Sequence, residues 1–174
     1  CAHMTRAQVR AAIAARLGAA VAGLGGRVHS SRAWPIQASG IGGAARMPAA
    51  LVYADRLRRT SVSGGMSAPT YRTILTVTIV LRAEGKTEAA VESSLDTLGE
   101  AVEAAIFTHP ATMAIAEEIV AADCARDLRP EGDLIVGQEA ISLDLQFTEM
   151  FEPAGLPDLV TARIVVDAID PADR

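Results

Sequence analysis

An alternation of apolar and polar side chains runs through residues 71–83 of this 174-residue chain. At its centre, alternate positions hold large aliphatic side chains: Leu75, Val77, Ile79 and Leu81. A period of two in a segment rich in β-forming residues predicts a strand with one buried face. At about 3.3 Å per residue this strand would be about 40 Å long, which is long for a small domain.

A second segment, residues 138–149, shows the same alternation, with apolar side chains at Ile141, Leu143, Leu145 and Phe147. Weaker patterns predict strands over residues 47–53 and 159–169, and a short one over 27–29. Residues 113–122 have helical spacing, but residues 119–128 also fit a strand, and both readings stay open. A turn is predicted over residues 130–133, which contain proline and glycine.

Two segments have helical periodicity. Residues 5–24 follow a capping threonine, Thr5, and end in a glycine-rich stretch. Their apolar stripe is Val9, Ile13, Leu17 and Val21. Residues 87–107 form the clearer helix, which the His109–Pro110 pair ends. The apolar face of this second helix holds Val91, Leu95, Leu98, Val102 and Ile106.

The expected order of elements is therefore α–β–β–α–β–β–β. Strands that come in runs favour an α+β fold: a single domain with a mostly antiparallel sheet, and with the N-terminal helix and the central amphipathic helix packed on one face. The domain is expected to span residues 5–169, between an expression scar at 1–4 and a polar tail at 170–174. Residues 55–70 are polar, basic and glycine-containing, and we expect a mobile hairpin connection there that orders on assembly.

The charges divide between the two halves of the chain. Residues 1–82 contain eleven arginines and one acid, a net charge of +10, whereas residues 83–174 contain five bases and twenty acids, a net charge of −15. This asymmetry suggests complementary surfaces, either within one fold or between copies of it. The alternative is that the two halves interleave and neutralise each other locally.

No motif for catalysis, a cofactor or a metal accompanies this split. His29 lies beside Ser30 and Ser31 but without an orienting acid, and Cys124 has no partner base nearby in the sequence. We expect no enzyme activity, cofactor or metal. Cys124 is the only cysteine outside the expected scar, which excludes an intrachain disulfide and fits a reducing compartment. No apolar run is long enough to cross a bilayer, and no signal peptide is recognisable, so no membrane partner is expected.

The residues that we select as candidate interface groups are charged. Three arginines cluster in the polar segment 55–70, which follows the predicted strand 47–53: Arg56, Arg58 and Arg59. The polar face of the 87–107 helix supplies the acidic candidates for a contact between copies: Glu92, Asp96, Glu100 and Glu103. Phosphate contact is an alternative role for the arginines. However, the chain is acidic overall and lacks the aromatic side chains on which single-stranded nucleic acids stack.

With these elements in place, the chain resembles the tail terminator, or minor tail protein, family of long-tailed phages, which includes tail-completion proteins. The resemblance rests on the order of elements and on four stretches: GRVHSSRAWPIQ, MPAALVYADRLRR, YRTILTVTIVLRAEGKTEAAVESSLDTLGEAVEAAI and GQEAISLDLQFTEMFE. Together with the N-terminal helix they cover most of residues 5–168.

The resemblance implies an α+β subunit that closes into a ring, usually a hexamer. Such a ring caps the tail-tube protein, stops its polymerisation and presents a surface to a head-completion protein. The subunit would act in the host cytoplasm during assembly and then in the virion tail. The alternatives are another phage structural part, either a tail-tube subunit or a head–tail connector, and an accessory protein that contacts nucleic acid.

Overall fold

A computed structural model describes residues 5–30, 47–63, 69–109 and 116–151. Its elements along the chain are α1 (Arg6–Ala20), a 3₁₀ turn η1 (Ala22–Leu24), β1 (Val28–Ser30), β2 (Ala49–Ser63), β3 (Thr70–Gly85), α2 (Glu88–Phe107), β4 (Glu118–Glu131) and β5 (Leu134–Met150). The strands form one sheet in the order β1-β2-β3-β5-β4, and every neighbouring pair is antiparallel except β1–β2. The predicted α+β class is confirmed.

β3 is the central strand of the sheet. Its 16 residues all pair with β5 on one side, and residues 70–82 pair with β2 on the other. Every second residue from Thr73 to Ala83 is buried, as the alternation in the sequence predicted. The large side chains Leu75, Ile79 and Leu81 are fully enclosed.

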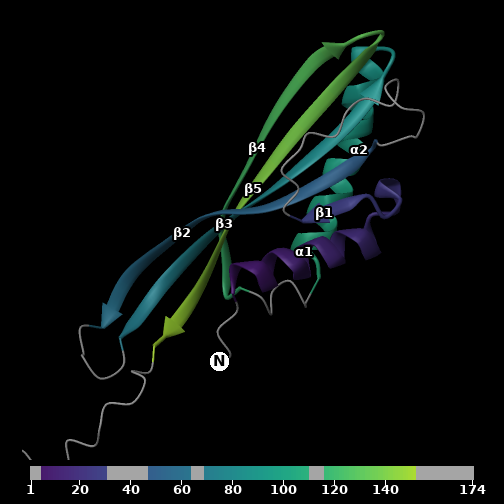
Figure 1. Cartoon of the computed structure of the whole chain (residues 1–174). Helices are drawn as coiled ribbons and strands as arrows, with labels where there is room; N and C mark the ends of the chain where they lie inside the picture. Colours follow the sequence, from purple (N-terminus) through teal and green to yellow (C-terminus); the bar gives the residue numbers. More distant parts are fainter. Residues whose placement is uncertain (1–4, 31–46, 64–68, 110–115, 152–174) are drawn as a thin grey trace, which may run out of the picture.

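Both helices cover the same face of the sheet, called here the helix face (Figure 1). α1 buries Val9, Ile13 and Leu17 against it, and its N-terminus is closed by a capping box between Thr5 and Gln8. α2 buries its predicted apolar stripe, and the Thr87 side chain caps its first turn. The predicted packing of both helices on one face is confirmed.

The opposite face, called here the open face, has no helix over it among the described residues. Its centre is polar: Thr76 Oγ1 donates a hydrogen bond to Asp144 Oδ1 at 2.6 Å, and Thr78 pairs with Ser142. A small apolar cluster, formed by Met47, Ala49, Leu51 and Val136, lies near one end of this face.

The prediction of a hairpin connection over residues 55–70 is wrong for residues 55–63. Residues 55–63 belong to β2, which pairs with β3 from Ala49 to Ser63 and continues well past the predicted end at residue 53. Figure 1 shows the ends of β2, β3 and β5 projecting beyond α1 as a three-stranded arm. The β2 side chains in the arm are largely exposed, so this part of the sequence is polar and has the composition of a connection. The segment is nevertheless a strand, because backbone hydrogen bonds pair it with β3, and composition does not reveal such bonds. Residues 64–68 lie outside the described residues, and mobility of the segment stays untested.

The ambiguous region after α2 is a strand, since β4 begins at Glu118 and continues to Glu131. The β4–β5 turn contains Gly132 with φ +66°, a left-handed conformation that glycine adopts without strain. The strand expected at 159–169, like the expected scar and tail, lies outside the described residues. No helix among the described residues is long and apolar enough to cross a membrane.

Two glycine-to-alanine substitutions should have opposite effects on stability. A Cβ added at Gly137 would lie 2.8 Å from Leu95 Cδ1 and would also meet Val91, so Gly137→Ala should lower the free energy of unfolding by about 1–3 kcal/mol. A Cβ added at Gly18 in α1 would lie 4.0 Å from Val28 Cγ2, an ordinary contact. Gly18→Ala should therefore raise the free energy of unfolding by about 0.5–1 kcal/mol, because alanine has the higher helix propensity. Urea denaturation measures both, and equal effects would contradict this packing of α2 on β5.

Candidate assembly surfaces

The three arginines of the basic cluster lie on β2, and the pleat of the strand divides them. Arg59 faces the helix side together with Leu57, whereas Arg56 and Arg58 lie on the open face, opposite Thr76 and Ile74 of β3. Arg56 and Arg58 are exposed and form no ion pair with a described residue. Arg72 of β3, opposite Thr60, adds a third exposed arginine to the open face.

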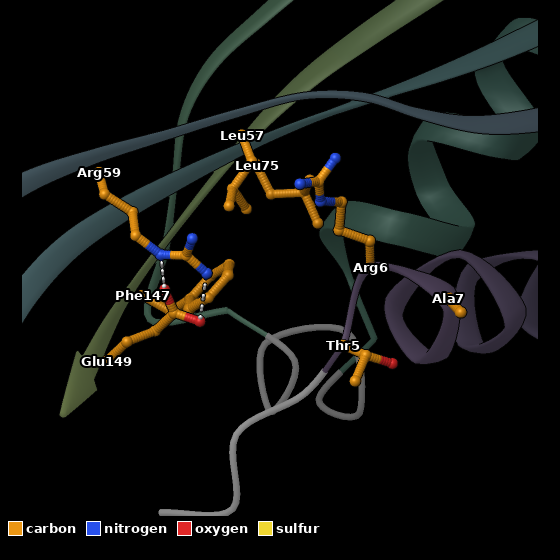
Figure 2. Close-up of a pocket in the computed structure, with 8 residues that line it drawn as sticks. All are labelled: Thr5, Arg6, Ala7, Leu57, Arg59, Leu75, Phe147 and Glu149. Carbon is orange, nitrogen blue, oxygen red and sulfur yellow. Dashed lines mark hydrogen bonds and ion pairs between the residues drawn. The ribbon is translucent and has the colours of Figure 1, made fainter. Parts of the chain in front are cut away.

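Arg59 serves the fold itself. Its Nε lies 2.7 Å from Glu149 Oε2, and its Nη2 lies 3.4 Å from Glu149 Oε1 (Figure 2). The Glu149 side chain is almost fully buried and also accepts a hydrogen bond from Thr73 Oγ1 at 2.5 Å. The hydrogen bond to Glu149 raises the pKa of Arg59 above its usual value. The Arg59 guanidinium also lies 5.3 Å from the centre of the Phe151 ring. These contacts join β2, β3 and β5 at the base of the arm.

The acidic candidates on α2 divide in a similar way. Asp96 Oδ1 lies 2.7 Å from Arg126 Nη2, and the same nitrogen lies 2.6 Å from Oε2 of the buried Glu139. The hydrogen bonds to Asp96 and Glu139 raise the pKa of Arg126. Asp96 therefore helps to attach β4 to α2, while Glu92 and Glu100 are exposed.

Cys124 lies on the helix face of β4, with its Sγ 3.9 Å from Glu103 Oε1. Desolvation of the thiol, with Glu103 and Glu139 nearby, raises the pKa of Cys124 and so disfavours the reactive thiolate. His29 lies in β1. Within residues 5–30, 47–63, 69–109 and 116–151, no three histidine, cysteine or acidic side chains come together in a way that could hold a metal ion.

The sheet presents two long strand edges. β1 covers β2 only from Ala50 to Val52, and no described strand pairs with the outer edge of β2 over residues 54–60. On the other side of the sheet, no described strand pairs with the outer edge of β4 over residues 118–130. Nearly all β4 side chains are exposed or half-exposed. Uncovered edges of this length are templates for pairing with another strand.

The two edges carry opposite charges on the open face. β2 contributes Arg56 and Arg58, and β4 contributes Glu118, Asp123 and Asp127. Asp127 also pairs with Arg129 on its own strand. The acids of β4 were not among the predicted acidic interface residues, which lie on the 87–107 helix instead. The signal that could have found them is the spacing of Asp123 and Asp127, which places both on one face of a strand.

No family model matches the sequence, and no curated protein matches it. Among solved structures, the fold is similar to that of a chain in the virion of a native gene transfer agent particle. That alignment has a TM-score of 0.41 and 10% sequence identity, and it covers 79% of this chain and 94% of the other.

Neighbouring arginines should differ sharply in their effect on stability. Arg59→Met removes the cation that lies 2.7 Å from the buried Glu149 carboxylate and should lower the free energy of unfolding by about 1–3 kcal/mol. Arg58→Met removes an exposed side chain that forms no ion pair with a described residue, and should change the free energy of unfolding by less than about 0.5 kcal/mol. Urea denaturation at neutral pH measures both.

The double variant Arg59→Met with Glu149→Gln is the control for this explanation. Because it removes the buried charge as well, it should be more stable than Arg59→Met alone. A double variant that loses the sum of the two single effects would mean that the two side chains do not interact.

Proposed function

We propose that this protein is a phage-type virion assembly subunit, of the kind that terminates a tail, and that copies of it join head to tail into a closed ring. The sequence resemblance supports the tail-terminator role. The observation that carries the assembly mode is the pair of strand edges with opposite charge on the two sides of one sheet. A surface that meets a different surface on the next copy forms a ring when the rotation closes.

The strand directions suit this contact. β2 and β5 run one way, and β3 and β4 run the other way. When β4 of one copy lies beside β2 of a copy in the same orientation, the two strands are antiparallel. The contact would therefore continue the antiparallel pattern of the sheet, in which pairing is slightly more stable per residue than in parallel strands.

The offset between the two edges suits a closed sheet. The middle of the β2 edge, Leu57, aligns through Leu75 with Leu145 of β5, whereas the middle of the β4 edge, Cys124, aligns with Ile141. The two edge midpoints are thus offset by four residues along the strands, which corresponds to about 13 Å. The four strands between them, β2, β3, β5 and β4, span about 19 Å side by side. This ratio corresponds to a strand tilt of about 35°, and closed sheets have tilts of about 35–45°.

The charges suit one register. If Leu57 lies opposite Cys124, the helix faces of the two copies coincide. Arg58 then lies directly opposite Asp123, and Arg56 lies diagonally between Asp123 and Asp127. Opposite charges across antiparallel strands contribute about 0.2–1 kcal/mol per pair, so they select the register more than they supply affinity. The acidic α2 residues are weaker candidates for this contact, because Arg56 and Arg58 lie on the other face of the sheet.

In this proposal the protein acts by steric blocking and electrostatic recognition, without catalysis. The ring would seat on the tail-tube protein and offer its other side to a head-completion protein. A tail-tube subunit is the second candidate function, since the same edges could serve open polymerisation. Electron microscopy at low salt distinguishes the two: a terminator should give single closed rings, whereas a tube subunit should give long stacks.

Charge-swapped variants test the edge contact. Arg56→Glu with Arg58→Glu places like charges at the junction, and so does Asp123→Arg with Asp127→Arg. Each double variant alone should remain monomeric under conditions where the natural sequence assembles. An equimolar mixture should assemble again, because every junction then joins opposite charges. Sedimentation velocity measures the oligomeric state, and unfolding by urea checks that each variant is folded.

A matched control uses the acids of α2. Glu92→Arg with Glu100→Arg makes the same charge change on α2, away from the open face, and should leave assembly intact. The natural assembly should also weaken as salt rises past about 0.15 M, where the Debye length is about 8 Å. Assembly of each double variant alone, or assembly that is lost in the α2 control, would overturn the proposed junction.

Hydrogen exchange reports on the same edges through the backbone. In the free subunit, residues 54–60 and 118–130 should alternate between slow and fast exchange, because every second amide points away from the neighbouring strand. Assembly should slow the fast amides in both segments and leave α2 unchanged. Uniformly slow exchange in the free subunit would show that these edges are already covered.

A further inference from the structure

A small cavity lies where the N-terminus of α1 meets the base of the arm. Figure 2 shows Arg59, Phe147 and Glu149 on one side of it, Arg6 on the other, and Leu57 and Leu75 between them. Its volume is about 290 Å³. The apolar stripe of α1 begins only at Val9, so the helix covers the sheet beyond this point and leaves Leu57 and Phe147 half-buried.

The walls of the cavity carry one positive charge in excess. Arg59 is neutralised by Glu149, as described above. Arg6 is exposed and forms no ion pair with a described residue, and the first turn of α1 contains no acid. Its side chain extends towards Leu57 and Leu75 (Figure 2). The cavity thus combines an apolar floor with a cation that a ligand can approach.

We infer that this cavity is a docking pocket for a partner polypeptide that presents an apolar side chain next to a carboxylate. The apolar side chain would lie on Leu57, Leu75 and Phe147, and the carboxylate would accept hydrogen bonds from Arg6. The volume falls just below the range of about 300–1,000 Å³ that is usual for small-molecule sites, which favours one side chain with its neighbour over a complete small ligand.

Short peptides test this inference on the full chain. The probe is acetyl-Phe-Glu-amide, compared with acetyl-Phe-Gln-amide and with hexanoate, in titrations followed by amide NMR shifts. The Glu peptide should bind about fivefold more tightly than the Gln peptide, the factor expected for one exposed charge pair. Its shift changes should centre on residues 5–7, 57–59 and 147–149. Hexanoate should bind more weakly than either peptide.

Variants on α1 separate the pocket from general charge effects. Arg6→Gln should remove the preference for the Glu peptide, while Arg10→Gln, the same change one turn further along the helix, should keep it. Ala7→Leu places a larger side chain at the cavity wall and should weaken both peptides. These substitutions leave the β2 and β4 edges unchanged, so their outcome is independent of ring assembly.

Any one of three results would overturn the inference. The first is no binding of the Glu peptide at 10 mM, taken as about the weakest measurable affinity. The second is an equal loss of the preference for the Glu peptide in the Arg6→Gln and Arg10→Gln variants. The third is tighter binding of hexanoate than of the peptides, which would make the cavity a site for small free acids.

Discussion

Successive side chains of a β-strand point to opposite sides of the sheet, and β3 follows this constraint over 16 residues. Because β3 pairs with both β2 and β5 along its length, its alternation sets which side of those strands faces the helices. Leu75 aligns with Leu57 on one side and Leu145 on the other, and this apolar row continues under α1 and α2. Arg56 and Arg58 reach the open face because the register shifts between Ala54 and Arg56, so the alternation of β2 changes phase there.

The charge asymmetry of the sequence serves two purposes in the structure. Some of the charges neutralise each other within the subunit: Arg59 of the basic half forms an ion pair with Glu149 of the acidic half, 90 residues away in the sequence. The remainder stays exposed, with arginines on the β2 side of the open face and acids on the β4 side. Local neutralisation therefore accounts for Arg59 and Glu149, and complementary surfaces are the role proposed for the charges that stay exposed.

Buried and exposed charges have different consequences here. The Glu149 carboxylate is almost fully buried, so the loss of Arg59 would leave a charge that water cannot reach. Arg56 and Arg58 are surrounded by solvent in the subunit, where an ion pair contributes little to stability. Such residues can be changed without loss of the fold, so in the proposed assembly they can select the partner strand at little cost to the stability of the subunit.

The sequence by itself determined the elements in which side-chain burial has a clear period. The two alternating strands, the two amphipathic helices and the Thr5 cap were all predictable, because each leaves its own local pattern of residues. The continuation of β2 through residues 55–63 left no such pattern: its side chains are mostly exposed, and only the backbone pairing with β3 makes it a strand. Only the tertiary structure decided which arginine would form an ion pair within the subunit, which strands would form the edges, and where a cavity would remain. These outcomes depend on strand order and register, which bring distant residues together through contacts that no local window of sequence contains.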